Sequence, residues 1–472
     1  MKPVPMRGRK TALFCLCLSI LGVGIGFLGT GKVLATTKSR FEKLELFNKV
    51  LFLVEGQYYR EVDTEKLIEG ALKGMMQTLD PHSAFLDKDV FQKMNEDTAG
   101  EFGGLGIEVT QKDGVLVVIT PIDDTPAFKA GLRSGDKIVE INGESIIGLA
   151  LDEAVDKMRG KPNTKISVGI VRKGVEGVKI YNMVRKKIKI EAVKSEIIDN
   201  HFLYVRLTQF QQNAGKEIAE AIKDNRSKVK GSVEGIVLDL RSNPGGLLTE
   251  AVNVSSLFLK DGVVVSTEGR DPKQKEIHYV KKNGYKETEV PLVVLVNGSS
   301  ASASEIVAGA LQDHKRAIIM GTQSFGKGSV QTVAKLDGDY GVKLTIAQYL
   351  TPKDRRIQAI GIAPDVVVSE FEGEWAKDHA VDSTYIREAD LRNHLTATIE
   401  TAEEKKARIQ REKEDRKRRQ EAIKRAKSAN KEDKKPSEKE ELQRKYAPSE
   451  DFQVIQAVKH LKTFSLAKEM SK

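Results

Sequence analysis

Ser302 and Lys327 are the residues whose types and settings best suit nucleophilic catalysis. Ser302 follows an apolar, β-prone run at 293–296 and a turn at 297–300, and it opens a helical stretch that continues to about residue 312. A serine at such a junction can act as a nucleophile, because the free N–H groups and the dipole of the helix stabilise an oxyanion. A plain serine N-cap fits the same local pattern, so this segment alone does not assign the role.

Lys327 lies in a glycine frame, residues 321–329, that is close to the phosphate-binding pattern GxxxxGK[ST]. Gly328 stands where that pattern needs a Mg²⁺-binding hydroxyl, and residues 330–333 read as a strand where a phosphate loop continues into a helix. The sequence therefore argues against nucleotide binding. A desolvated lysine loses its charge more readily, which would let Lys327 act as a general base and take the proton of Ser302.

Residues 103–109, Gly-Gly-Leu-Gly-Ile-Glu-Val, place glycines at the start of a strand. Such a start lets successive backbone N–H groups turn inward and hold a carboxylate, while the strand edge accepts a peptide as an added strand. Alone, the pattern also fits a bulge or a turn. The motifs at 126–127, 130–132, 135–136 and 141–143 follow in an order that resembles a PDZ domain of exported proteases. We therefore expect Gly104, Leu105, Gly106 and Ile107 to bind the C-terminus of a substrate.

The elements that must position these residues form five regions. Apolar positions at three- and four-residue spacing predict helices from Phe41 to Tyr58 and from Ile68 to Leu79. Strands that alternate with helices, such as those at 236–240, 293–296 and 318–320 with helices at 214–223 and 305–312, predict an α/β layer structure. The expected regions are a signal peptide or anchor at 1–35, the N-terminal helical part of the core at 36–100, the PDZ-like domain at 101–183, the α/β core at 184–370, and a charged, helical or partly disordered region at 371–472.

The fold class expected from these regions is an α/β (α+β) core with an inserted PDZ-like, β-rich domain. An N-terminal membrane or signal helix and a charged C-terminal helical tail flank it. The charged tract is interpreted as an exposed helix or as disorder, and it ends in a weakly amphipathic piece with Phe452, Ile455, Val458 and Leu461, for which docking on the core stays open.

The N-terminus predicts export. Lys2, Arg7, Arg9 and Lys10 precede an uncharged apolar stretch at 11–30, and the sequence Val-Leu-Ala follows at 33–35. About 20 residues just span ~30 Å of hydrocarbon, but the end at Ala35 also fits a cleavage site, so a membrane anchor and a cleaved signal both stay open. Basic residues on the N-terminal side keep that end in the cytoplasm, so we expect a periplasmic or cell-envelope location for the rest.

Composition removes several classes of protein. Both cysteines, Cys15 and Cys17, lie in the apolar N-terminal run, which excludes disulfide scaffolds, cysteine-ligated zinc and thiol catalysis in the rest of the chain. The seven histidines show no HExxH or HxH spacing, so neither a metal nor a cofactor is expected. The chain has a net charge of +10, and residues 401–450 carry six of these surplus charges, with 18 basic and 12 acidic residues. This mixture of signs argues against a nucleic-acid partner.

Six motifs together resemble the carboxyl-terminal processing proteases, also called tail-specific proteases, which are serine peptidases that use a Ser–Lys dyad. The resemblance covers about residues 40–370. The motifs are Leu-Asp-Pro-His-Ser at 79–83, Phe-Gly-Gly-Leu-Gly at 102–106, Leu-Asp-Leu-Arg-Ser-Asn-Pro-Gly-Gly at 238–246, Ser-Ala-Ser-Ala-Ser-Glu at 300–305, Phe-Gly-Lys-Gly at 325–328 and Gly-Ile-Ala-Pro-Asp at 361–365.

This resemblance implies roles for individual residues. Ser302 matches the nucleophile, Lys327 the general base, and Gln331 the side chain that orients the lysine. The N–H of Ala303, with that of Gly245 or Gly246, matches the oxyanion hole, and the sequence does not say which glycine donates.

Other charged residues near the motifs receive structural interpretations. Asp239 and Arg241 are expected to form a structural ion pair at a strand end. Asp313 follows Ser302 by three helical turns, ~16 Å along the axis, so direct contact is implausible and it is at most supportive. His82 and His314 are interpreted as packing or surface residues, because a Ser–Lys mechanism needs neither.

The function hypothesis is a serine endopeptidase of the cell envelope that captures an unstructured apolar C-terminus through its PDZ-like domain. The alternative is a catalytically silent scaffold that binds C-termini through the same domain, and the presence of serine, lysine and glutamine at fitting positions argues against it. Expected partners are protein or peptide substrates, with the membrane through the N-terminal segment. The sequence leaves open an adaptor, a homo-oligomer and the identity of the substrates.

Overall fold

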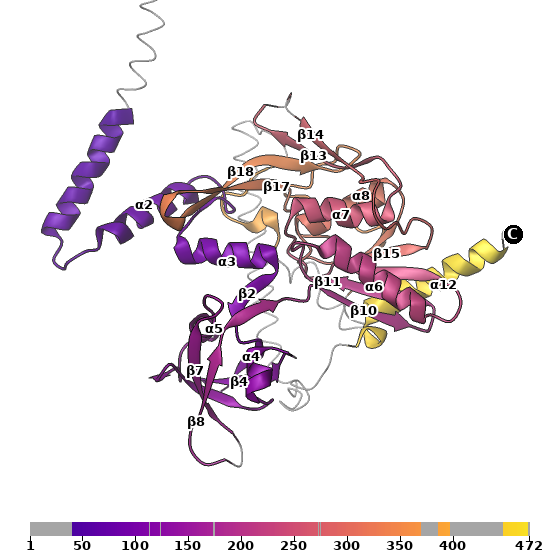
Figure 1. The fold of residues 1–472 in the computed structure, drawn as a ribbon. Coiled ribbons are helices and arrows are strands. Elements are labelled where there is room, and N and C mark those ends of the chain that lie inside the picture. Colours follow the sequence, from indigo (N-terminus) through magenta and orange to yellow (C-terminus); the bar gives the residue numbers. More distant parts are fainter. Residues whose placement is uncertain are drawn as a thin grey trace, which may run out of the picture. The chain divides into compact units, whose positions relative to one another are not determined.

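A six-stranded sheet carries the segments that hold Ser302 and Lys327 (Figure 1). The structure is a computed structural model that describes residues 40–369, apart from 113, 123, 173, 174, 272 and 274, together with residues 386–396 and 447–470. β10 and β11 pair antiparallel and the remaining neighbours pair in parallel. In sheet order the strands are β10 (Val193–Ile198), β11 (Phe202–Leu207), β12 (Gly235–Asp239), β15 (Leu292–Val296), β16 (Ile318–Gly321) and β19 (Val366–Val367).

Helices cover both faces of this sheet. Ile236 and Leu238 of β12 pack in the cluster that contains residues of α6 (Ala214–Lys228), α7 (Leu248–Phe258) and α8 (Ala303–Asp313). Val237, between them, packs on the opposite face against α12 (Phe452–Met470), because successive side chains of a strand point to opposite faces. Strands buried on both faces must be apolar throughout, which explains their continuous hydrophobic runs. The strands and helices predicted for the α/β core are confirmed.

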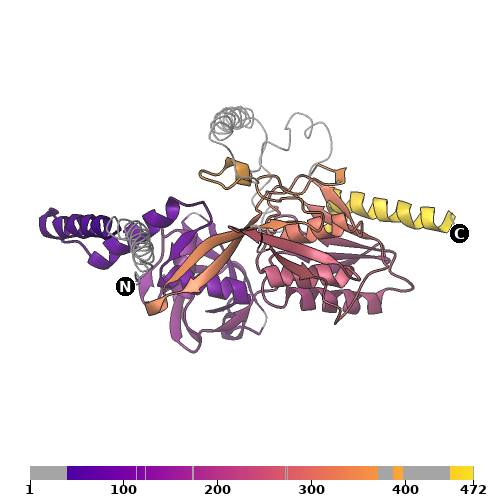
Figure 2. The ribbon, with the colours of Figure 1, turned by 90° about the horizontal axis from the view of Figure 1, so that it is seen from above.

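A second, five-stranded antiparallel sheet lies beside this core. Its strands are β1 (Ala84–Leu86), β13 (Val263–Gly269), β14 (Lys275–Tyr279), β17 (Ser329–Lys335) and β18 (Gly341–Leu350). A 3₁₀ turn, η1 (Asp337–Asp339), joins β17 to β18, and the two strands form a long ribbon that Figure 2 shows in orange. This ribbon matters for the site because β17 begins two residues after Lys327.

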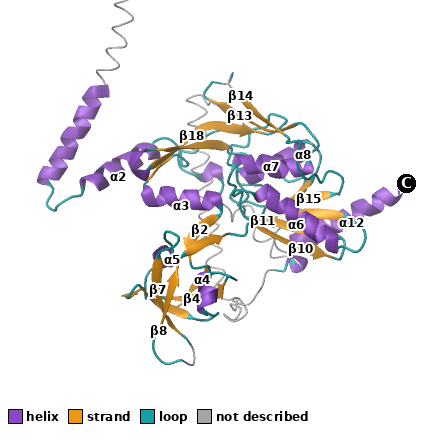
Figure 3. Cartoon of the chain, viewed as in Figure 1, coloured by secondary structure: helices purple, strands orange, loops and turns teal. Residues whose placement is uncertain are grey.

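The β-rich domain expected near residue 101 forms a six-stranded antiparallel sheet with two short helices (Figure 3). Its own core includes Val118, Ile138 and Val168. β2 precedes this domain in the chain and β9 follows it, and the two strands pair with each other in a two-stranded sheet. These elements are β2 (Glu101–Gly104), β3 (Ile107–Lys112), β4 (Val115–Pro121), α4 (Pro126–Ala130), β5 (Lys137–Ile141), β6 (Glu144–Ser145), α5 (Leu151–Met158), β7 (Lys165–Val171), β8 (Lys179–Val184) and β9 (Lys186–Lys189).

The N-terminal part of the described chain is helical. Among the described residues, 40–75 belong to a unit separate from the rest; residues 40–57 are helical and α2 (Thr64–Gln77) begins in it, so the two predicted helices are confirmed. The next helix, α3 (Lys88–Ala99), was not predicted, although Asp87 caps its N-terminus and Gly100 ends it at a φ of 69°. No helix of the described residues is long and apolar enough to cross a membrane, and the predicted signal or anchor at 1–35 lies outside those residues.

The weakly amphipathic piece near the end of the chain forms the helix α12, which docks on the core. The helix follows η4 (Pro448–Glu450), and its buried face consists of Val454, Ala457, Val458 and Leu461. Phe452 and Ile455 are only half-buried, so the docked face is shifted by one or two positions from the predicted one. Most of the charged tract at 401–450 lies outside the described residues.

The docked face of α12 predicts a stability effect. Leu461 is 2% exposed and packs so closely on Gly235 that a Cβ there would lie 2.8 Å from a Leu461 methyl carbon. We expect Leu461→Ala to lower the free energy of unfolding by about 2–5 kcal/mol, because it leaves a cavity. Phe464, 53% exposed on the same helix, is the control, and Phe464→Ala should change that free energy little. Equal effects of the two changes in denaturant titrations would contradict the docking.

Candidate active site

Ser302 occupies a strained turn between β15 and α8. Its φ of 55° and ψ of −111° lie in a region that residues other than glycine rarely adopt. The turn is fixed by its neighbours, since the Ala301 N–H and the Ser304 hydroxyl both donate to the Asn243 carbonyl oxygen, at 3.0 and 2.9 Å. Ser302 itself is 7% exposed. A rigid frame that holds a serine in an unfavourable backbone conformation is typical of a functional position.

The glycine loop at 243–246 lies against this turn. A Cβ on Gly245 would be 2.9 Å from the Ala303 nitrogen, so only glycine permits the contact. The Gly245 N–H donates to Asn243 Oδ1 at 2.9 Å, whereas the N–H groups of Gly246 and Ala303 have no hydrogen-bond partner in the described part of the chain. Of the two glycines, Gly246 is therefore the one with a donor left for a substrate oxygen.

Glu305 joins the serine turn to the lysine loop. Its side chain is fully buried, and one carboxylate oxygen accepts the N–H of Ser302 at 2.8 Å and the N–H of Lys327 at 2.9 Å. The other oxygen accepts the Gly326 N–H at 2.7 Å and the Ser324 hydroxyl at 2.6 Å. Burial raises the pKa of Glu305 to about 7, although the four donated hydrogen bonds pull it down. Sequence reasoning missed this residue, which had one signal, a glutamate at the third position of the helix that follows Ser302.

The Lys327 side chain is largely buried in the loop between β16 and β17. Burial lowers the pKa of its ammonium group and Lys343 lowers it further, while Glu388, Glu305 and Asp80 act in the opposite direction. Within the described residues its Nζ has no hydrogen bond or ion pair, and none joins it to Ser302 Oγ. The structure thus brings the two loops together through Glu305, without a hydrogen bond between the two reactive groups.

Gln331, predicted to orient the lysine, lies on β17. Its amide nitrogen donates to Ser329 Oγ at 2.9 Å and to Thr345 Oγ1 at 3.2 Å, and no bond to Lys327 is present. Thr345 Oγ1 in turn donates to Asp80 Oδ1 at 3.1 Å. Gln331 is therefore held near the start of the lysine strand by a polar chain that ends at Asp80.

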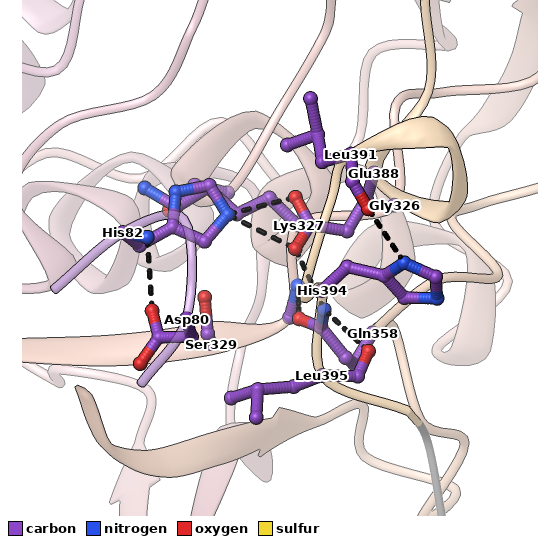
Figure 4. A network of polar contacts seen from close by, with 12 residues as sticks. Asp80, His82, Gly326, Lys327, Ser329, Gln358, Glu388, Leu391, His394 and Leu395 are labelled. Carbon is purple, nitrogen blue, oxygen red and sulfur yellow. Dashed lines mark hydrogen bonds and ion pairs between the residues drawn. The ribbon is translucent and has the colours of Figure 1, made fainter. Parts of the chain in front are cut away.

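The Leu-Asp-Pro-His-Ser motif at 79–83 brings Asp80 and His82 into this network. The Asp80 carboxylate accepts the N–H groups of His82 and Ser83, each at 2.9 Å, and these hydrogen bonds with those of Ser83 and Thr345 hold its pKa below the usual value although burial opposes them. His82, interpreted from the sequence as a packing or surface residue, is instead bonded to the buried Glu388 carboxylate at 2.8 Å (Figure 4). This partner lies 306 residues away in the chain, so no local pattern indicates the contact.

The remaining charged residues have structural partners. Asp239 and Arg241 form the predicted ion pair at 2.7 Å, and both are buried. Arg241 also binds Asp451 at 2.9 Å and Gln453 at 2.8 Å, which ties the glycine loop to the start of α12. Asp313, at the far end of α8 from Ser302, binds Arg355, and its neighbour His314 is bonded to the Val263 carbonyl. Neither reaches Ser302.

The loop around Lys327 does not have the form of a phosphate-binding loop. The N–H groups of Gly326 and Lys327 donate to Glu305, that of Gly328 donates to Gln358 Oε1 at 2.9 Å, and a strand follows. The N–H groups that would cradle a phosphate are therefore occupied by protein oxygens. The interpretation of this motif as a misleading resemblance is confirmed.

The predicted carboxylate cradle lies between β2 and β3. Gly106 has a φ of 72°, and a Cβ on it would be 2.3 Å from the Thr125 side chain. The carbonyl groups of Leu105 and Gly106 accept N–H groups from Ala127 and Ile122, while their own N–H groups have no partner in the described part of the chain. Two consecutive free donors next to a strand edge have the form of a peptide carboxylate site.

Comparisons with known proteins agree with these features. Residues 201–368 match the model of peptidase family S41, residues 94–171 the PDZ domain model, and residues 30–90 the model of the activating protease CtpB N-terminal domain. A PDZ domain binds the C-termini of peptides.

Three curated relatives share most of the chain. A carboxy-terminal-processing protease of Bartonella bacilliformis is 46% identical over 366 residues, which cover 77% of this chain and 83% of the relative. The carboxy-terminal processing protease CtpA of Bacillus subtilis is 36% identical over 75% of each chain. A carboxyl-terminal-processing protease of Synechocystis is 37% identical over 64% of this chain and 70% of its own. The chain therefore belongs to the carboxy-terminal processing proteases, serine peptidases of family S41 that contain a PDZ domain.

Proposed function

We propose that this chain is an endopeptidase in which Ser302 and Lys327 form a catalytic dyad that cleaves proteins with unstructured, apolar C-terminal tails. The observation that carries the proposal is the Glu305 carboxylate, which binds the backbone N–H of both residues. Through this one group the serine turn and the lysine loop have a fixed relation. A lysine whose charge is disfavoured by burial is suited to be the base.

The chemistry follows from these groups. Neutral Lys327 takes the proton of Ser302 Oγ, and the oxygen attacks the carbonyl carbon of the scissile bond. The N–H groups of Ala303 and Gly246 stabilise the oxyanion, and the lysine then returns the proton to the leaving amine. A water molecule, deprotonated by the same lysine, hydrolyses the acyl-enzyme and restores Ser302.

The dyad must close before this reaction starts. Within the described residues Lys327 Nζ has no hydrogen bond or ion pair, either to Ser302 Oγ or to another group, so no such bond has to be broken for it to move. Catalytic hydrogen bonds commonly tighten only when the substrate is bound. In this proposal the occupied substrate site brings the two groups to hydrogen-bond distance.

The PDZ domain supplies the substrate. Leu105 and Gly106 offer free N–H groups to the terminal carboxylate, with Gly104 and Ile107 on either side, and the tail extends from there to Ser302. Capture and cleavage at separate sites favour long, unstructured tails over short folded ends. The proposed place of action is the cell envelope, on the evidence of the basic and apolar N-terminal segment alone.

Changes in the dyad test the proposal first. Ser302→Ala and Lys327→Ala should each lower kcat by roughly 10⁴-fold or more, because residues that act as one unit fail together. Peptide cleavage and circular dichroism check activity and folding. Ser299→Ala is the matched control, since Ser300 and Ser304 donate to the carbonyl groups of Leu240 and Asn243 and would disturb the turn. An active Lys327→Ala enzyme would exclude the dyad, and a wild type without activity on any tail would favour the silent scaffold.

The pH dependence tests the lysine as base. A base with a lowered pKa becomes neutral below pH 10.5, so kcat/KM should rise with pH through the pKa of Lys327. Glu305, with a pKa of about 7, acts in the same direction, because its protonation at lower pH removes an acceptor from the loops. Lys327→Arg should be inactive at every pH, since a guanidinium stays charged. A rate that falls from pH 6 to 9 in the folded enzyme would refute this role.

Amidated peptides test recognition of the tail. Amidation removes the terminal charge, so kcat/KM should fall at least about tenfold although the scissile bond is unchanged. Gly106→Val should produce the same loss on the free acid, because its side chain would meet Thr125. On amidated peptide, Gly106→Val and the wild type should be equally slow. Equal rates for free-acid and amidated peptides in the wild type would mean that this cradle does not select substrates.

A further inference from the structure

A short segment beyond the match to peptidase family S41 lies on the Lys327 loop. This strap, residues 386–396, contains the 3₁₀ turn η3 (Glu388–Asp390). The Glu388 N–H donates to the Phe325 carbonyl oxygen at 3.2 Å. The strap is thus hydrogen-bonded to the chain two residues before the lysine.

Gln358 connects the strap to the residue that follows Lys327. Its side chain has no exposed surface, and its amide oxygen accepts the Gly328 N–H at 2.9 Å. Its amide nitrogen carries two hydrogens, and both are donated to the strap, one to Glu388 Oε1 at 2.8 Å and one to the Leu395 carbonyl oxygen at 2.9 Å. Every polar atom of this amide therefore has a partner. Figure 4 shows Gln358 and its partners on the strap together with Lys327.

The strap determines which way the Gln358 amide faces. The oxygen and the nitrogen of an amide have nearly the same shape, so their hydrogen-bond partners fix the orientation. The Glu388 carboxylate and the Leu395 carbonyl are both acceptors and bind the nitrogen, which leaves the oxygen for the Gly328 N–H. The backbones are in close contact at this point, since a Cβ on Gly328 would lie 2.3 Å from the Gln358 nitrogen.

His82 fixes the carboxylate on which this orientation depends. The Glu388 side chain is 0% exposed, and its Oε2 and Oε1 lie 2.8 and 3.0 Å from His82 Nε2. A buried carboxylate is costly unless it is paired and hydrogen-bonded. His82 and Gln358 supply those bonds, so the carboxylate has a defined position.

The Lys327 loop is therefore held by two groups of residues. Glu305 binds the Lys327 N–H from α8. The strap binds the Phe325 carbonyl directly and the Gly328 N–H through Gln358. Glycine has more conformational freedom than any other residue, so a lysine between two glycines has a fixed place only where such bonds restrain its neighbours.

We propose that Glu388 and Gln358 are positioning residues that hold the Lys327 loop at the place from which the lysine reaches Ser302. The inference rests on the proposed role of Lys327 as base. Both residues act on the backbone beside the lysine and not on its side chain. The strap is accordingly part of the active site, although it lies outside the match to the peptidase family.

Two changes at Glu388 in the full-length protein test this hold. Glu388→Ala removes an acceptor that orients Gln358, so kcat for peptide cleavage should fall about 10²-fold, because a misplacement of about 1 Å can cost that much. KM should stay nearly the same, since tail capture does not use this loop. Glu388→Gln keeps an oxygen at the Oε1 position, and one tautomer of His82 accepts the new N–H, so at least about a third of the wild-type kcat should remain.

Ile386, 69% exposed at the start of the strap, provides the matched control. Ile386→Ala should be as active as the wild type. A Glu388→Ala enzyme with wild-type kcat, or a Glu388→Gln enzyme as slow as Glu388→Ala, would overturn the proposal.

A second pair of changes exchanges the donor and the acceptor. Gln358→Glu places a second buried carboxylate against Glu388, so kcat should fall at least as far as in Glu388→Ala. Adding Glu388→Gln restores one donor–acceptor pair, while the new carboxylate still accepts the Gly328 N–H. The double variant should be at least about tenfold faster than Gln358→Glu alone, although the Leu395 carbonyl stays without its donor. A double variant no faster than the single one would contradict the proposed bridge.

Amide exchange separates a displaced loop from a misfolded protein. Hydrogen–deuterium exchange at residues 325–328, followed by mass spectrometry, should become at least about tenfold faster in Glu388→Ala and stay unchanged in Glu388→Gln. Unchanged exchange in Glu388→Ala would overturn the proposal even if the rate of cleavage falls. If Glu388→Ala does not fold, as judged by circular dichroism, the comparison of Gln358→Glu with the double variant decides. If all these changes occur while Lys327→Ala remains an active protease, the hold on the loop stands and the assignment of the base is wrong.

Discussion

The arrangement of the site depends on one buried carboxylate that accepts four hydrogen bonds. Glu305 lies in the first turn of α8 with no exposed surface, and its two oxygens bind the serine turn and the lysine loop. Burying an ion costs several kcal/mol, and hydrogen bonds from four donors offset that cost. The donors also depend on the carboxylate, because three of them are backbone N–H groups with no other hydrogen-bond acceptor in the described residues. The group therefore acts as a rigid link between two chain segments.

A second buried polar residue performs the same task for the glycine loop. Asn243, also with no exposed surface, donates to Leu207 at the end of β11, accepts from Gly245, and through its carbonyl holds Ala301 and Ser304. Ser242 and Ser302 both have a φ of 55°, a conformation that costs on the order of 1–3 kcal/mol each. This strain persists because the surrounding hydrogen bonds leave the two turns no relaxed alternative. The geometry of the Ser302 turn is thus a property of the surrounding frame and not of the serine alone.

The sequence predicted what depends on neighbours in the chain. The strand–turn–helix around Ser302, the alternating strands and helices of the core and the Asp239–Arg241 pair are local patterns, and each was found. The roles of Glu305, His82 and Glu388 were not predicted. Ser302 lies three residues from Glu305, but the other partners of Glu305 lie 19 to 22 residues away and His82 and Glu388 are 306 residues apart, so local patterns do not show that these groups meet. The buried face of α12 differs from the one that the sequence pattern indicated, because a weak amphipathic pattern does not show which side chains of a helix meet the sheet. Periodicity identifies elements, whereas the pairing of buried polar groups requires the folded chain.

The contact of Arg241 with Asp451 and Gln453 has a consequence for the timing of folding. Arg241 belongs to the loop that ends at Gly246, yet two of its side-chain partners come from a segment about 210 residues further along the chain. Domains fold from the N-terminus as the chain is made, so the strands of the core emerge well before this brace. A growing chain that has not yet reached residue 451 contains Ser302, Lys327 and the two glycines, but it lacks two of the groups that anchor the glycine loop. Synthesis of the last segments thus separates the making of the peptidase core from the moment at which its glycine loop is anchored.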